Sequence, residues 1–154
     1  ARRITRMAVE DIGLADARAL RITLDAAEAF HRLGYPEGKL ALAQAAVYLA
    51  QAKKSNAIYK ALGQAERDVQ ETSADSVPLH LRNAPTALMK EAGYGEGYRY
   101  AHDEPNAFAA GEVYLPDALN GTRFYHPNER GMEKTLKAKR EYLDNLNQQS
   151  NRKR

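Results

Sequence analysis

The sequence contains no cysteine and no tryptophan, and its apolar runs are short. The lack of cysteine excludes disulfide bridges and thiolate metal sites. The longest uncharged apolar run covers residues 40–52, which is shorter than the roughly 20 residues that a membrane helix needs. No basic start followed by an apolar stretch marks export. We therefore expect a cytoplasmic chain without a membrane partner. Because it opens without methionine and is already amphipathic at Ile4, we also expect a piece of a longer protein.

Catalytic motifs are also missing. There is no phosphate-binding loop of the form Gly-x-x-x-x-Gly-Lys-Ser/Thr and no Gly-x-Ser-x-Gly motif. The glycine-rich residues 93–98 follow a predicted helix, whereas a dinucleotide site needs a strand before it and a helix after it. His102, Asp103 and Glu104 are of metal-ligand type, but consecutive residues rarely converge on one ion, and Pro105 after them favours a turn. We expect no catalytic activity, no cofactor and no metal in this chain.

Hydrophobic spacing predicts an all-α fold. Four segments with helical spacing of apolar residues, at 4–12, 17–33, 37–52 and 55–70, follow one another with short loops. Gly13 is expected to end the first helix, and Asp16 and Ser55 to cap the second and fourth. The third segment is apolar nearly all round, so either other helices or another subunit must cover it.

The second half of the chain has a different composition. Residues 77–128 hold five of the six prolines, five of the ten glycines and five of the nine tyrosines. We expect a loop wrap clamped by tyrosines, with one short helix at residues 84–92. A small β-ribbon is an option for residues 112–115 and 122–125. The predicted organisation is a helical region at residues 1–76, then the wrap and a last helix at residues 77–147 in the same domain. A disordered tail at residues 148–154 completes the chain.

Two surfaces are candidates for binding. Residues 130–154 hold eight Lys or Arg against three acids, within an overall net charge of +3. Upstream, aromatic and basic side chains alternate, a pattern that suits single-stranded nucleic acid because bases stack on rings while arginines follow phosphates. The alternative is that the rings pack inward as loop clamps. The candidate residues for contact with DNA or a partner are Tyr98, Arg99, Tyr100 and Arg123.

The other candidate surface is for self-association. Its predicted residues lie on the third helix and at the end of the first: Leu42, Ala46, Tyr48, Leu49, Glu10 and Asp11. The two acids lie where the helix dipole disfavours anions. This position suggests a salt bridge to another helix or subunit, with a simple solvated pair as the alternative.

Several long segments resemble the family of replication-associated recombination protein A, also called RarA or MgsA. They are residues 6–16 (RMAVEDIGLAD), 36–45 (PEGKLALAQA), 54–57 (KSNA), 78–85 (PLHLRNAP), 93–102 (GYGEGYRYAH) and 114–116 (YLP). The resemblance covers nearly the whole chain.

This resemblance implies the C-terminal part of a AAA+ ATPase that is related to clamp-loader subunits and to Werner-helicase-interacting protein. Such proteins act in replication-fork maintenance and DNA recombination and repair. The implied fold is similar to the clamp-loader collar, and the implied assembly is a homotetramer. ATP and Mg²⁺ would be bound by a domain that this sequence lacks. The implied partners are DNA and single-stranded DNA-binding protein, and the implied location is the cytoplasm, at the nucleoid. A nucleic-acid-binding module is the alternative function.

Overall fold

The structure is a computed structural model that describes residues 1–72 and 75–152. It contains α-helices and short 3-10 or π-helical turns, and no strand among those residues. The chain forms two compact units. The first comprises Ala1–Glu66 with Phe124–Lys139, and the second comprises Arg67–Arg123 with Arg140–Arg154. Among the described residues, no helix is both long and apolar enough to cross a membrane.

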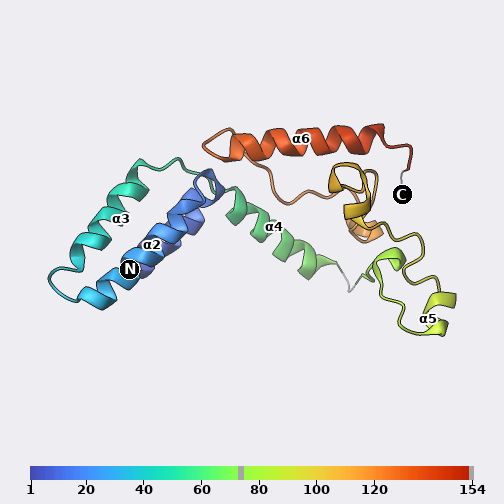
Figure 1. Ribbon diagram of the computed structural model, residues 1–154, viewed down its shortest axis with the longest axis horizontal. Coiled ribbons are helices and arrows are strands. Elements are labelled where there is room, and N and C mark those ends of the chain that lie inside the picture. The colour runs from blue at the N-terminus through green and yellow to red at the C-terminus, as the bar shows by residue number, and fades with distance from the viewer. Residues whose placement is uncertain (73–74, 153–154) are drawn as a thin grey trace. The chain divides into compact units, whose positions relative to one another are not determined.

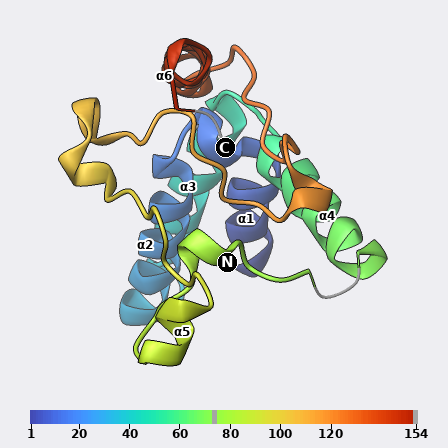
Figure 2. The same ribbon diagram turned by 90° about the vertical axis from the view of Figure 1, so that its right-hand side faces the viewer.

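The first unit is built on three helices that pack side by side: α1 (Arg2–Met7), α2 (Arg18–Leu33) and α3 (Lys39–Gln51) (Figures 1 and 2). The α1 helix continues as a π-helical turn at Ala8–Ile12 and a 3-10 turn at Gly13–Ala15. The first predicted helix therefore does extend to Ile12, but with a wider last turn than expected. Gly13 has a φ of 51°, and an added Cβ would lie 2.9 Å from the Ser55 carbonyl oxygen. Only glycine allows that close approach.

Small side chains set the packing of α2 against α3. Buried Ala19 and Ala26 on α2 and buried Ala45 on α3 let the two helices approach closely. The core joins Ala19 and fully buried Leu49 to Ala8 and Ile12 of the π-helical turn. The predicted all-α fold is thus confirmed, with packing between the first three of the four predicted helices.

The second unit is mostly irregular. The α4 helix (Ala57–Glu71) enters it, and α5 (Ala87–Glu91) is its only short α-helix among the described residues. The Thr86 hydroxyl accepts a hydrogen bond from the Met89 backbone N–H, so Thr86 caps α5, which begins later than the predicted residue 84. The last helix, α6 (Glu133–Gln149), begins in the first unit and ends in the second.

The optional β-ribbon is wrong for the described residues. Backbone groups in this part of the chain bond to side chains and turns instead: the Val113 carbonyl bonds to His80, and the Gly111 N–H donates to Asn147. Residues Asp117–Leu119 then form a 3-10 turn. The α6 helix also extends two residues into the segment predicted to be disordered. The Asn147 contact and a Ser150 hydroxyl bond to the Ala110 carbonyl hold that end. Residues 153–154 of the predicted tail lie outside the described part.

Candidate interaction surfaces

One side of α3 has no neighbour within its unit. Leu40 is 77% exposed and Val47 is 65% exposed, although both are large and apolar. Ala43 and Ala50 are exposed as well. Spacings of three, four and three residues place these four on one side of the helix. We call Leu40, Ala43, Val47 and Ala50 the α3 face. An exposed apolar strip of this kind is typical of a contact site.

The predicted interface residues on α3 do not share one environment. Leu49 lies in the core with an exposed fraction of 0%. Leu42 is half-buried, and Ala46 is exposed at the flank of the α3 face. Tyr48 is half-buried, and its hydroxyl donates a 2.5 Å hydrogen bond to the Asp16 carboxylate. Sequence reasoning could not separate these sides, because a helix that is apolar all round carries no periodic signal.

Asp16 connects α3 to the start of α2. Its carboxylate accepts bonds from the Arg18 guanidinium at 2.9 and 3.0 Å and from the Arg18 backbone N–H at 3.1 Å. The Arg18 hydrogen bond, with further help from Tyr48, lowers the pKa of Asp16 from 3.8 to about 2. Hydrogen bonding to the same carboxylate raises the pKa of Tyr48. Asp16 therefore fixes the orientation of Tyr48. The prediction that Asp16 is the N-cap of α2 is wrong by one residue, because Ala17 holds that position, but Asp16 still accepts the N–H of Arg18, the first residue of α2.

The two acids at the end of the first helix make no ion pair to another helix in the described chain. Glu10 accepts a 2.6 Å bond from Arg6, one turn earlier in the same helix. Asp11 is exposed, and its carbonyl oxygen accepts the Ser55 backbone N–H at 2.8 Å. A contact of these acids with another subunit stays a prediction.

A buried carboxylate fastens residues 124–133 to the helices of the first unit. Glu133 is 0% exposed. Its Oε2 accepts the Ser55 hydroxyl at 2.8 Å and the Asn128 backbone N–H at 3.0 Å, and its Oε1 accepts the Tyr125 hydroxyl at 3.0 Å. No Lys or Arg among the described residues pairs with it. We call this arrangement the Glu133 clasp.

Sequence reasoning missed the clasp. It counted Glu133 with the solvated charges of the basic C-terminal segment, and nothing local distinguishes it from Glu129 or Glu141. The clasp depends on Ser55, which lies 78 positions away.

The aromatic and basic segment of the second unit separates into exposed rings and engaged cations. Tyr98 and Tyr100 are 57% and 55% exposed. The Arg99 guanidinium instead bonds to Glu104 at 2.7 Å and to the Ala110 carbonyl at 2.8 Å.

The Glu104 pairing also bears on the candidate metal triplet. Glu104 is held by Arg99, and the pKa of Glu104 is lowered by that hydrogen bond. The His102 ring lies 5.1 Å from the Tyr100 ring. In residues 1–72 and 75–152, no group of three or more His, Cys, Asp or Glu is placed to hold a metal.

Arg123 is likewise engaged. Its guanidinium makes two bonds to the Asp144 carboxylate of α6, at 2.6 and 2.7 Å, and the side chain is 46% exposed. This hydrogen bonding lowers the pKa of Asp144. The exposed rings of this segment therefore lie near arginines whose guanidinium groups are paired with carboxylates.

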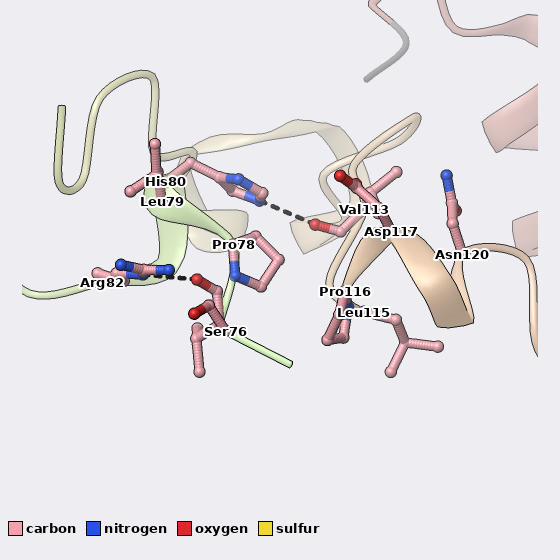
Figure 3. Close-up of a pocket in the computed structure, with 11 residues that line it drawn as sticks. Ser76, Pro78, Leu79, His80, Arg82, Val113, Leu115, Pro116, Asp117 and Asn120 are labelled. Atoms are coloured by element: carbon pink, nitrogen blue, oxygen red, sulfur yellow. Dashed lines mark hydrogen bonds between the residues drawn. The ribbon is translucent and has the colours of Figure 1, made fainter. Parts of the chain in front are cut away.

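The second unit also holds a half-open cavity of about 410 Å³ between residues 76–82 and 113–120 (Figure 3). Prolines and aliphatic side chains form most of its wall: Val77, Pro78, Leu79, Val113, Leu115 and Pro116. His80 spans the two segments through a 2.8 Å bond to the Val113 carbonyl. Arg82 bonds to the Val77 carbonyl at 2.6 Å and to the Tyr94 hydroxyl at 3.2 Å. The walls of the cavity are therefore held by hydrogen bonds within the loop wrap.

Comparison with known proteins shows which family the chain belongs to. A family model described as MgsA AAA+ ATPase C terminal matches residues 1–144. The chain belongs to the MgsA AAA+ ATPase C-terminal family. As a member of this family, it is 60% identical to replication-associated recombination protein A of Coxiella burnetii over 97% of its length. It is also 52% identical to the Escherichia coli K12 protein of that name over all of its length.

A more distant family relative is ATPase WRNIP1 of Dictyostelium discoideum, which is 42% identical over 80% of this chain. The chain spans 34% of the length of each of the two bacterial relatives and 14% of the length of the Dictyostelium protein. The MgsA C-terminal family therefore accounts for one part of much longer AAA+ ATPases.

Proposed function

We propose that this chain is the self-association module of a longer AAA+ ATPase that acts in replication-associated recombination. The observation that supports self-association is the α3 face. Burying Leu40 and Val47 in a subunit contact would contribute about 1.5–3 kcal/mol for each side chain. Closed symmetry is the usual outcome when copies of one chain associate, and a tetramer is our expectation.

The role in recombination is proposed from the names of the two bacterial relatives. ATP and Mg²⁺ would be bound elsewhere in the whole protein, since this sequence has no phosphate-binding loop to hold them. We propose the cytoplasm as its location, with DNA and single-stranded DNA-binding protein as partners of the whole protein.

Mass in solution tests the self-association. We expect the molecular mass from sedimentation equilibrium to rise above that of one chain as concentration increases. Val47→Glu should shift the association to higher concentration, because a carboxylate would have to lose its water at the contact. Ala138→Glu on α6 is the control, since Ala138 is exposed and has the charged residues Lys134 and Glu141 beside it on the helix. A wild-type chain that stays monomeric at every concentration would refute self-association, and equal effects of the two substitutions would exclude the α3 face as its contact.

Single-stranded nucleic acid is the second candidate partner, and the exposed rings of Tyr98 and Tyr100 support it. Base stacking on such rings is worth about 1–3 kcal/mol per base. Replacing both tyrosines by alanine should therefore weaken binding to a fluorescent oligothymidine. Tyr59→Ala, at a ring 58% exposed on α4, is the control. Binding that is unchanged in all variants would exclude these rings.

A further inference from the structure

In side-chain size, the α3 face is complementary to its own reverse. Along it, a large side chain alternates with a small one in the order Leu40, Ala43, Val47, Ala50. Ala45 lies midway, both between Leu40 and Ala50 and between Ala43 and Val47. A second α3 laid antiparallel and centred at the same level therefore brings each large side chain opposite a small one.

We propose that two copies of this chain pair through the α3 face, antiparallel, about a two-fold axis level with Ala45. This inference rests on the proposed self-association and specifies its geometry. Leu40 would lie opposite Ala50 of the partner subunit, and Val47 opposite Ala43 of the partner subunit. Alternation of large and small residues lets the two surfaces interdigitate without voids.

A parallel pair fits less well. It sets Leu40 against the same leucine, Val47 against the same valine, and alanine against alanine. The bulky pairs would then hold the helices apart at two levels and leave gaps at the other two. An isologous antiparallel contact has neither defect, and it closes with two subunits.

Charges beyond the ends of α3 favour the same register. Glu37 precedes α3 and Lys53 follows it, each eight positions from Ala45. Both side chains are exposed, and neither makes an ion pair or hydrogen bond in the described chain. In an antiparallel pair, the end of α3 that Glu37 precedes lies beside the end that Lys53 follows in the partner subunit, and this happens at both ends of the contact. Between Glu37 and Lys53 the only charged residue is Lys39, at the first position of α3, where its ammonium lies over the Tyr35 ring. The α3 face itself is uncharged.

The size of the contact sets its strength. A helix of 13 residues is about 20 Å long, so one helix pair buries less than the roughly 1,200 Å² of a stable interface. The pair should therefore dissociate on dilution unless a second contact in a larger ring supports it. A method that captures transient pairs is needed.

Cysteine cross-linking gives such a method, because the chain has no cysteine of its own. Leu40→Cys and Ala50→Cys proteins are prepared separately, mixed, and treated with a short bismaleimide. In the proposed register, position 40 faces position 50 of the partner subunit, whereas two copies of position 40 lie about 15 Å apart along the helix axis. The mixture should give several-fold more cross-linked dimer than either protein alone. A parallel pair would instead cross-link each protein with itself.

Charge reversal provides an independent arm. Glu37→Lys and Lys53→Glu should each weaken association about five- to tenfold, since each turns two exposed attractions into repulsions. The double variant should restore wild-type association, and Glu66→Lys, at an exposed residue of α4, is the control.

The outcomes separate the two proposals. A monomeric wild-type chain overturns the self-association itself. If the chain associates but the mixed Leu40→Cys and Ala50→Cys proteins do not cross-link, only the antiparallel pairing is overturned. The same holds if the double charge-reversal variant does not regain wild-type association.

Discussion

Replacing Glu133 tests whether the clasp fastens residues 124–133 to the helices. In Glu133→Gln, one amide oxygen can still accept from Ser55 and from the Asn128 N–H, and the amide nitrogen can donate to a rotated Tyr125 hydroxyl. The hydrogen bonds remain, but each is weaker because the acceptor no longer carries a negative charge. We therefore expect a loss of about 1–2 kcal/mol in the free energy of unfolding.

Glu133→Ala removes the acceptor altogether. Three hydrogen bonds to a charged group at about 1.5–3 kcal/mol each are lost, with less than additive effect, and the Asn128 N–H has no acceptor. We expect a loss of about 3–5 kcal/mol. Tyr125→Phe removes one donor and should cost about 1–2 kcal/mol.

Urea unfolding followed by far-UV circular dichroism at neutral pH measures these changes. Glu141→Gln is the matched control, because Glu141 is exposed on the same helix, and its loss should stay within about 0.5 kcal/mol. Hydrogen exchange should also show faster exchange of residues 124–132 in Glu133→Ala. The reasoning fails if Glu133→Gln and Glu141→Gln unfold at the same urea concentration, or if Glu133→Ala loses less than Glu133→Gln.

Further expectations concern Gly131, Asp16 and Arg123. Gly131→Ala should cost several kcal/mol or prevent folding, because its φ is 55° and an added Cβ would collide with the Ala15 carbonyl oxygen. Gly121→Ala, with a φ of 79° and open space around it, should cost only about 1–2 kcal/mol. Urea unfolding measures both losses. The folded pKa of Asp16, about 2, lies below its ordinary 3.8. Asp16 therefore contributes at most about 2 kcal/mol to the free energy of unfolding above pH 4, and this contribution is lost as the pH falls toward 2. In an acid titration of stability, Asp16→Asn should lack this part of the loss. Arg123→Ala should cost at most about 1 kcal/mol, since its ion pair with Asp144 is half exposed, and a larger loss in urea unfolding would contradict that assignment.

The helices of the first unit could be predicted from sequence because their signals are local. Apolar spacing, the stop at Gly13 and the side chains of Asp16 and Ser55, which accept the first N–H of α2 and of α4, act within one or two helical turns. The all-α class and the family resemblance followed from the same kind of information. The absence of a phosphate-binding loop was equally visible in the residues themselves.

Tertiary structure determined which residues are buried, which are exposed and which form ion pairs. On α3 the sequence is apolar on every side, so only the packing against α2 and the π-helical turn shows that Leu49 lies in the core while Leu40 and Val47 are exposed. The Glu133 clasp joins residues 78 positions apart, and a glutamate there has the same local pattern as a solvated one. By residue type, Arg99 and Arg123 were candidates for phosphate binding, but in the folded chain they form ion pairs with Glu104 and Asp144. Periodicity determines which segments become helices, whereas burial and ion pairing depend on which segments meet, and that is a property of the whole chain.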